Sequence, residues 1–268
     1  MTFIDSHAHL CDPAFDTDRE QTIARVLAAG VSHFIEIACQ VDEWNGGLAL
    51  AEKYPAHCAA VLGIHPEFAR TYTPQAHARL TQLLKDPHAV AVGEIGLDYV
   101  YLHESDKDTQ IHVLEQMLQL ANDVQKPIVL HVRREGEDYE PYERTFDMLR
   151  HLWKPSKSLK KPGVLHCFSA GYDTAKEALD LGLLLGINGC FTYKKNEYIR
   201  EAVKKAGVDK LILETDCPYL SPQGKRGTRN DPSNIPLIGQ WVADYLDIPV
   251  EKLAEITTQN TLDLYGLK

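Results

Sequence analysis

The chain has 268 residues, of which 44% are apolar and 25% are charged, and these proportions are ordinary for a soluble globular protein and argue against a disordered one. Its formal net charge of -10 argues against tight, nonspecific binding of duplex nucleic acid, which depends on neutralising phosphates. The charge remains compatible with a phosphate-containing substrate that is held by metal ions and a few basic residues.

We expect a cytoplasmic protein without a membrane anchor and without an obligate protein partner. No apolar run approaches the roughly 20 residues that span a bilayer, and residues 1–5 lack the basic and apolar segments of a signal peptide. The six cysteines form no CxxC pair, and most lie in or beside apolar runs, where a thiol packs as a small hydrophobic group. A disulfide framework is therefore not expected.

A short apolar strand followed by a longer helical stretch recurs eight times along the chain. The Val, Ile and Leu content of the strands is typical of a parallel sheet that is buried on both faces. We expect strands at residues 2–7, 32–38, 58–64, 89–94, 127–131, 163–166, 183–187 and 210–214.

Helices are predicted between these strands. In residues 106–122, apolar residues recur at steps of three and four, which gives a helix one apolar face. Residues 22–29 are predicted to form a helix that stops at Gly30, a residue suited to a C-terminal cap. Ser105 and Thr73 are predicted helix starts, and two or three more helices fill the C-terminal segment.

Eight strand–helix units in 268 residues favour a closed (β/α)8 TIM barrel that forms one domain over residues 1–268. An open, doubly wound sheet is the structural alternative, and it usually carries a glycine-rich phosphate loop after its first strand. Here the first strand runs into His7 and His9, and neither GxGxxG nor GxxxxGK[ST] occurs. The polar, basic residues 153–162 are predicted to form a flexible loop before the sixth strand.

Ionisable residues stand at the C-terminal ends of the predicted strands, where the active sites of such barrels lie. His7 and His9 are two residues apart, so their side chains share a face of the first strand. Burying many polar groups at one mouth is costly unless they are paired or bind metal. The corresponding positions of other strands hold His65, Glu94, His131, His166, Glu214 and Asp216.

Imidazole and carboxylate ligands together suit zinc, manganese, iron or magnesium, and two-metal hydrolases use this mixture. Taken singly, each histidine could be a hydrogen-bonded core residue. Five of the twelve histidines lie at these strand ends, however, which favours a shared metal site. His57 and His88 fall at the opposite ends of strands and are predicted to be structural or solvated. Asp5 and Glu214 share strand parity with His7 and Asp216, and we expect both to support the ligands.

Six motifs and a C-terminal segment give the sequence a resemblance to one family. The motifs are DSHAHL at 5–10, GIHP at 63–66, GEIGLDY at 93–99, LHVR at 130–133, LHCFS at 165–169 and LETDCPYL at 213–220, followed by NTLDLYG at 260–266. In this combination and order they resemble the TatD-type deoxyribonucleases, which belong to the amidohydrolase-like metallohydrolases.

The resemblance implies two divalent metal ions per chain, which would be zinc, magnesium or manganese. It also implies that His65, at the mouth, contacts substrate phosphate. The implied ligands are His7, His9 and Asp216 for one ion and His131 and His166 for the other, with Glu94 as the bridge.

A bridged ion pair lowers the pKa of bound water and so produces hydroxide near neutral pH. Asp216 is the predicted general base, because a carboxylate beside the metal can orient and deprotonate that water, and Glu94 is the second predicted catalytic residue. The alternative role of Asp216 is that of a ligand only. Arg133 and Arg226 could each bind substrate phosphate or be solvated surface charges.

We therefore expect a hydrolase of ester bonds that acts as a DNA exonuclease on single-stranded ends, with a 3′ polarity that the resemblance alone implies. One alternative is hydrolysis of an amide, a lactone or an aminoacyl ester such as a mischarged tRNA. Many amide-cleaving relatives bridge their metals with a carboxylated lysine, so Glu94 favours phosphodiesters. A second alternative is a non-catalytic metal-binding scaffold, which the complete set of ligand positions disfavours.

Overall fold

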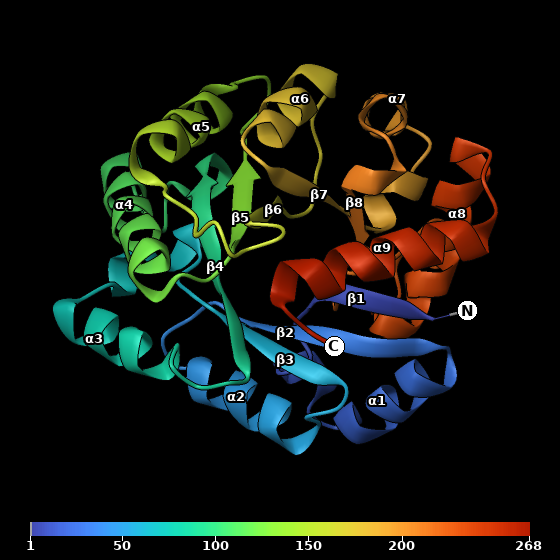
Figure 1. Ribbon diagram of the computed structural model, residues 1–268, viewed down its shortest axis with the longest axis horizontal. Helices are drawn as coiled ribbons and strands as arrows, with labels where there is room; N and C mark the ends of the chain where they lie inside the picture. Colours follow the sequence, from blue (N-terminus) through green and yellow to red (C-terminus); the bar gives the residue numbers. More distant parts are fainter. Residues whose placement is uncertain (1) are drawn as a thin grey trace.

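Eight parallel strands form the centre of the computed structural model, which describes residues 2–268 (Figure 1). Each strand pairs with the next along the chain, and β1 also contacts β8, so the sheet curls into a nearly closed barrel. The strands are β1 (Phe3–Ala8), β2 (Val31–Ala38), β3 (Cys58–Leu62), β4 (Ala89–Asp98), β5 (Ile128–Arg133), β6 (Gly163–Leu165), β7 (Leu183–Ile187) and β8 (Leu211–Leu213).

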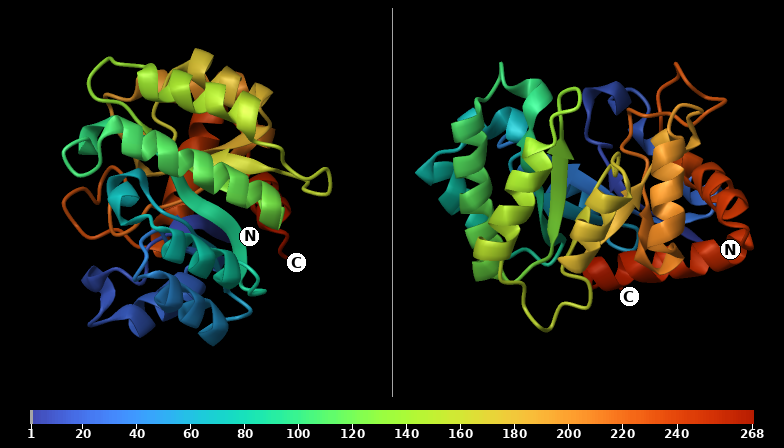
Figure 2. Two further views of the ribbon diagram at one scale, coloured as in Figure 1. Left: turned by 90° about the vertical axis from the view of Figure 1, so that its left-hand side faces the viewer. Right: turned by 90° about the horizontal axis from the view of Figure 1, so that it is seen from above.

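Helices surround the barrel and confirm the predicted (β/α)8 TIM architecture (Figures 1 and 2). Within residues 2–268, none of them is long and apolar enough to cross a membrane. The α-helices are α1 (Arg19–Ala28), α2 (Trp44–Lys53), α3 (Pro74–Leu83), α4 (Lys107–Val124), α5 (Glu140–Leu152), α6 (Tyr172–Asp180), α7 (Glu197–Ala206), α8 (Ile235–Leu246) and α9 (Val250–Tyr265).

The predicted strands are found, with changes at their ends that matter for the site. Strand β4 continues to Asp98, so Glu94 lies inside a strand and not at its end. Strands β6 and β8 stop at Leu165 and Leu213, so His166 and Asp216 lie in the loops that follow. These loops free the two side chains from the strict alternation of a strand.

One of the two predicted helix starts is correct. The Thr73 side chain accepts a hydrogen bond from the Ala76 amide at the start of α3. The prediction for Ser105 is wrong, because Asp106 caps α4 by accepting from the Thr109 amide. The Ser105 hydroxyl instead donates to the carbonyl of Glu67, a tertiary contact that the local sequence does not reveal.

Apolar side chains pack on both faces of the curved sheet. Those facing outward meet the helices, and alternate strand positions such as Ile35 and Ile37 form a separate inner cluster. Leu264 and Tyr265 of α9 belong to this inner cluster, and the Tyr265 hydroxyl donates to the Ser6 carbonyl at 3.0 Å. Helix α9 therefore closes the N-terminal end of the barrel (Figure 2), which leaves the other end for polar side chains.

Backbone contacts beyond the end of β8 close the barrel near the ionisable residues at its strand ends. The Asp216 amide donates to the His7 carbonyl, and the His9 amide donates to the Cys217 carbonyl, both at 3.0 Å. Ala8 and Cys217 form a parallel bridge. This pairing places Asp216 next to His7 of β1 and His9, which follows the strand.

The basic residues 153–162 connect α5 to β6 at the end of the barrel that α9 covers (Figure 2). Lys160 Nζ lies 2.7 Å from Asp263 Oδ1 on α9. The loop is thus tied to the C-terminal helix, far from the strand ends that carry the ionisable residues.

Leu264→Ala should lower the free energy of unfolding by about 2–5 kcal/mol, because it leaves a void in the inner core, where Leu264 is 1% exposed. Urea unfolding followed by circular dichroism measures this loss. The control is Glu255→Ala on the exposed side of the same helix, where the ion pair with Lys252 is solvated and the change should stay within about 0.5 kcal/mol. Equal unfolding midpoints for wild type and Leu264→Ala would contradict the role given to α9.

Candidate metal centre

A cavity of about 540 Å³ opens at the C-terminal ends of the strands. Loops and strand ends from around the barrel line it, as expected for a site at this end of the fold. Most of the side chains predicted as metal ligands or substrate contacts line it together: His9, His65, Glu94, His131, Arg133, His166 and Asp216.

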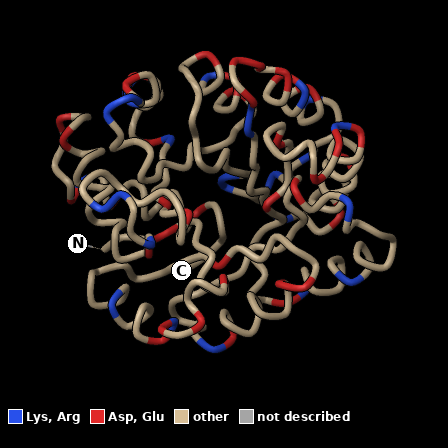
Figure 3. The backbone as a smooth tube through the Cα atoms, turned by 180° about the vertical axis from the view of Figure 1, so that it is seen from behind, with Lys and Arg blue, Asp and Glu red and all other residues tan. Residues whose placement is uncertain are grey.

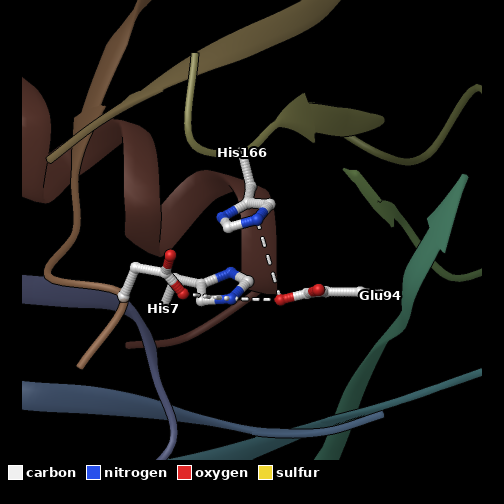
Figure 4. A group of neighbouring side chains, drawn as sticks. His7, Glu94 and His166 are labelled. Atoms are coloured by element: carbon white, nitrogen blue, oxygen red, sulfur yellow. Dashed lines mark ion pairs between the residues drawn. The ribbon is translucent and has the colours of Figure 1, made fainter. Parts of the chain in front are cut away.

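Glu94 is buried at the centre of this group, and its two carboxylate oxygens face different histidines. Oε1 contacts His7 Nε2 and lies 3.7 Å from His166 Nε2. Oε2 lies 3.5 Å from His65 Nε2 and 3.8 Å from His131 Nδ1. Figure 4 shows His7 and His166 directed at the same oxygen of Glu94. One carboxylate therefore joins two sets of imidazoles.

Asp216 lies against His7 at the end of β1 and His9 just beyond it. Its Oδ1 is 3.6 Å from His7 Nε2 and 3.5 Å from His9 Nε2. The backbone at Asp216 is left-handed, with φ of 57°, a conformation that aspartate adopts more readily than most residues. Its carbonyl accepts from the Tyr219 amide at 3.0 Å, so the turn is held on both sides. The structure thus brings this carboxylate together with His7 and His9, from a loop and not from a strand end.

Among residues 2–268, two groups of side chains each offer ligand atoms that lie within 4.8 Å of one another. One group is His7, Glu94, His166 and Asp216, and the other is His65, Asp98 and His131. His9 falls outside both groups, although its Nε2 is also 3.6 Å from Glu94 Oε1. His7 Nε2 and Glu94 Oε1 are buried, and neither makes a hydrogen bond. Buried imidazole nitrogens and carboxylate oxygens of this kind are satisfied by a divalent cation, so the residues fit a metal ion.

Electrostatics in the centre also favour a cation. Burial alone would raise the pKa of Glu94, but the charges of His166 and His7 hold that pKa well below its ordinary value. Burial likewise opposes ionisation of Asp216, and its contacts with His9 and His166 nevertheless lower its pKa. Burial disfavours protonation of His166, yet Glu94 and Glu214 raise its pKa to about 9. The two carboxylates are therefore anionic, and their negative charge favours binding of a divalent cation among these histidines.

Asp98, which the sequence analysis did not single out, holds His131 in place. His131 Nε2 lies 2.9 Å from Asp98 Oδ2, which leaves Nδ1 facing the centre, 3.3 Å from His166 Nε2. A carboxylate on the far nitrogen fixes the ring orientation and the position of its proton. The sequence could have revealed this role through the spacing of the GEIGLDY motif. Asp98 lies four residues after Glu94, so the alternation of a strand directs both side chains to the same face.

Glu36 is a second supporting residue that sequence reasoning missed. It is fully buried on β2, and its carboxylate accepts from the amides of Leu10 at 2.8 Å and Cys11 at 3.0 Å. Burial raises its pKa to about 7 against the lowering effect of these bonds. It anchors the chain directly after His9. The sequence could have revealed this residue, because a carboxylate inside the apolar run of residues 34–38 must be buried and needs a partner.

The two predicted supporting residues lie beside candidate ligand histidines. Glu214 Oε1 is 3.4 Å from His166 Nδ1 and accepts from the Cys167 amide at 2.6 Å. Asp5 Oδ1 accepts from the His7 amide at 3.2 Å and from the Thr215 amide at 2.9 Å. Asp5 therefore connects the first strand to the segment after the last.

Of the three residues predicted to contact substrate, two line the cavity and one does not. His65 lines the cavity, and burial lowers its pKa to about 3, so this imidazole is neutral. Arg133 also lines the cavity, with about half of its side chain exposed. Arg226 is not among the lining residues, and its guanidinium lies over the ring of Tyr193 at 4.6 Å.

The two histidines set aside in the sequence also lie outside the cavity lining. His57 Nδ1 is 2.8 Å from the Ser32 carbonyl, and His88 Nδ1 is 3.0 Å from Asp86 Oδ1. Both rings thus have local partners, as expected for structural residues.

Asp5→Asn should change how stability depends on pH. Burial raises the pKa of Asp5 from 3.8 to about 8, so the folded protein keeps a proton that the unfolded chain releases near pH 4. Raising the pH between 5 and 7 then favours the unfolded chain by up to about 1.4 kcal/mol per pH unit in the wild type. The amide of Asn mimics the protonated acid and cannot lose its proton.

Urea unfolding in excess chelator at several pH values measures this effect. The stability of Asp5→Asn relative to wild type should rise steadily from pH 5 to pH 7. A difference that stays constant over this range would mean that Asp5 is ionised in the folded protein.

The chain is similar over nearly its whole length to known proteins. A family model described as TatD related DNase matches residues 4–266. The uncharacterized metal-dependent hydrolase YabD of Bacillus subtilis is 32% identical over 263 residues, 98% of each chain. The 3'-5' ssDNA/RNA exonuclease TatD of Erwinia amylovora is 32% identical over 268 residues, 98% of this chain and 99% of the relative. The solved structure of YjjV, a TatD homologue from Escherichia coli, is 29% identical, with a TM-score of 0.89 and coverage of 99% of this chain and 98% of its own.

Proposed function

Because the chain belongs to the TatD-related DNases and is a metal-dependent hydrolase of that family, we propose that it acts as an exonuclease on the 3′ ends of single-stranded DNA. The relative from Erwinia amylovora is named as a 3'-5' exonuclease of single-stranded DNA and RNA. The observation that carries the proposal is the shared carboxylate of Glu94, which faces two sets of imidazoles at the floor of an open cavity.

The proposed centre holds two divalent ions, which would be zinc, manganese or magnesium. When bound, such ions lower the pKa of water and offset the negative charge of a phosphodiester. Each oxygen of Glu94 would serve one ion, since the two oxygens face different partners. The remaining ligands would be His7, His9 and Asp216 for one ion and His131, through Nδ1, for the other. His166 Nε2 lies between the two positions, 3.7 Å from Glu94 Oε1 and 3.3 Å from His131 Nδ1, and we assign it to the ion of His131.

Asp216 is the proposed general base. It lines the cavity, and its lowered pKa keeps the carboxylate anionic at neutral pH. An anionic carboxylate at this position can orient an attacking water and accept its proton.

His65 is the proposed donor to the substrate phosphate. Its Nδ1 accepts a hydrogen bond from the Glu67 amide at 3.1 Å, so the proton of the neutral ring is on Nε2. That nitrogen is on the side of Glu94, at the floor of the cavity. Arg133 supplies an exposed positive charge in the same cavity.

The surface charge favours a strand end over a duplex. Figure 3 shows Lys and Arg interspersed with Asp and Glu around the molecule, and the net charge is -10. Duplex DNA is bound along its phosphates by a basic face, whereas a strand end can be held inside one cavity.

Metal titration tests the shared carboxylate. The metal-free protein should bind two equivalents of Mn²⁺ or Zn²⁺ per chain in isothermal titration calorimetry. Glu94→Ala should lose at least one equivalent, because the bridge contributes to both positions. His88→Ala, a histidine at the opposite end of a strand, is the control and should still bind two. Unchanged binding by Glu94→Ala would contradict the proposed centre.

Activity is tested with a 5′-labelled single-stranded oligonucleotide in the presence of Mg²⁺ or Mn²⁺. The wild type should shorten it stepwise from the 3′ end. Asp216→Asn should lower kcat/KM at least about 100-fold, since it removes the general base. His151→Ala, at an exposed position on α5, is the matched control.

The same assay separates the alternatives when duplex DNA, single-stranded RNA and aminoacyl-tRNA are added to the panel. Turnover of aminoacyl-tRNA alone would replace the nuclease proposal with ester hydrolysis at the same site. Full activity of Asp216→Asn on the oligonucleotide would contradict the role proposed for this carboxylate.

A further inference from the structure

An exposed aromatic side chain lines the cavity of the metal centre. Among residues 2–268, four large hydrophobic side chains are exposed: Tyr139 at 41%, Tyr198 at 44%, Tyr219 at 57% and Trp241 at 40%. Tyr219 is the most exposed of the four and the one that lines the cavity. Its position three residues after Asp216 makes it a wall of the proposed active site.

The backbone of Tyr219 is fixed although its ring is exposed. Its amide donates to the Asp216 carbonyl at 3.0 Å, and its carbonyl accepts from Asn230 Nδ2 at 2.7 Å. The hydroxyl lies 3.3 Å from Asp12 Oδ2, which tethers the outer end of the ring. A ring that is already held in place loses little conformational freedom when a ligand packs against it.

A second aromatic residue lines the same cavity from the loop after β4. Tyr101 ends the short 3-10 helix η3 (Tyr99–Tyr101), and its ring is half-buried. The guanidinium carbon of Arg133 lies 5.7 Å from the centre of the Tyr101 ring, within the range of a cation–π contact. The loops that follow β4 and β8 project at the same end of the barrel (Figure 2). Two tyrosine rings and one arginine thus line the same cavity as the candidate metal ligands.

We propose that Tyr219 and Tyr101 form a stacking subsite for the terminal nucleobase of the substrate, with Arg133 beside the adjoining phosphate. This inference rests on the proposed nuclease function. Proteins that hold single strands without sequence preference stack bases on aromatic rings, because every base offers a π-face. In a chain with a net charge of -10, stacking supplies affinity that long-range attraction of phosphates does not.

The subsite also gives a reason for selecting unpaired ends. Inside a duplex the faces of a base are covered by its stacked neighbours, and its edge is paired. A terminal base must leave that stack before it can lie against Tyr219. Single strands and frayed ends meet this condition without the loss of base pairing.

The test compares two oligonucleotides that differ only in the last nucleoside, which is thymidine in one and an abasic tetrahydrofuran analogue in the other. For the wild type, removing the base should lower kcat/KM for the first cleavage at least tenfold, mainly through KM. Tyr219→Ala should lower kcat/KM at least tenfold on the thymidine substrate, and its effect should be at least fivefold smaller on the abasic one. Tyr219→Phe keeps the ring and should retain most of the preference for a base.

Tyr198→Ala is the matched control, because Tyr198 is exposed but does not line the cavity. Equal cleavage of both substrates by the wild type would overturn the stacking subsite and leave the nuclease proposal intact. An equal loss of kcat/KM for Tyr219→Ala on both substrates would also overturn it, because the effect of the ring would then not depend on the presence of the base. Failure of the wild type to cleave either substrate would overturn the nuclease proposal itself. Metal content and circular dichroism of each variant show that the centre and the fold are preserved.

Discussion

The metal centre depends on two backbone hydrogen bonds that join the beginning of the chain to the segment after β8. They run from the Asp216 amide to the His7 carbonyl and from the His9 amide to the Cys217 carbonyl. Because β8 itself ends at Leu213, this short pairing is what completes the barrel at its open end. It brings a carboxylate from one end of the sheet against imidazoles from the other. Glu94 contacts the imidazole of His7 from the opposite side of the cavity.

Around this junction, buried carboxylates have three different tasks. Glu94 and Asp216 remain anionic because histidines surround them. Asp98 orients a histidine ring. Asp5 and Glu36 accept hydrogen bonds from backbone amides beside His7 and His9. The polar groups thus satisfy one another in layers, which reduces the penalty for burying them beneath an open cavity.

Much of this arrangement could be predicted from the sequence, because apolar runs and strand ends are local patterns. The order of eight strand–helix units led to the barrel, and the barrel in turn made the strand-end histidines neighbours. The supporting residues were harder to find. Glu36 acts on amides of Leu10 and Cys11, which have no side-chain signature. Asp106 caps α4 in place of Ser105, whose hydroxyl makes a tertiary contact with the Glu67 carbonyl. The loop around Arg226 is exposed, and its sequence has no apolar pattern from which its conformation could be predicted.

The position of α9 has a consequence for how the protein is made. Leu264 and Tyr265 fill the floor of the barrel, and Tyr265 is bonded to the carbonyl of Ser6 on the first strand. During translation the eight strands emerge before α9, whose residues cap their interior. The inner core therefore stays incomplete until α9 has left the ribosome. Folding of the barrel is finished only when this helix meets the strand that was made first.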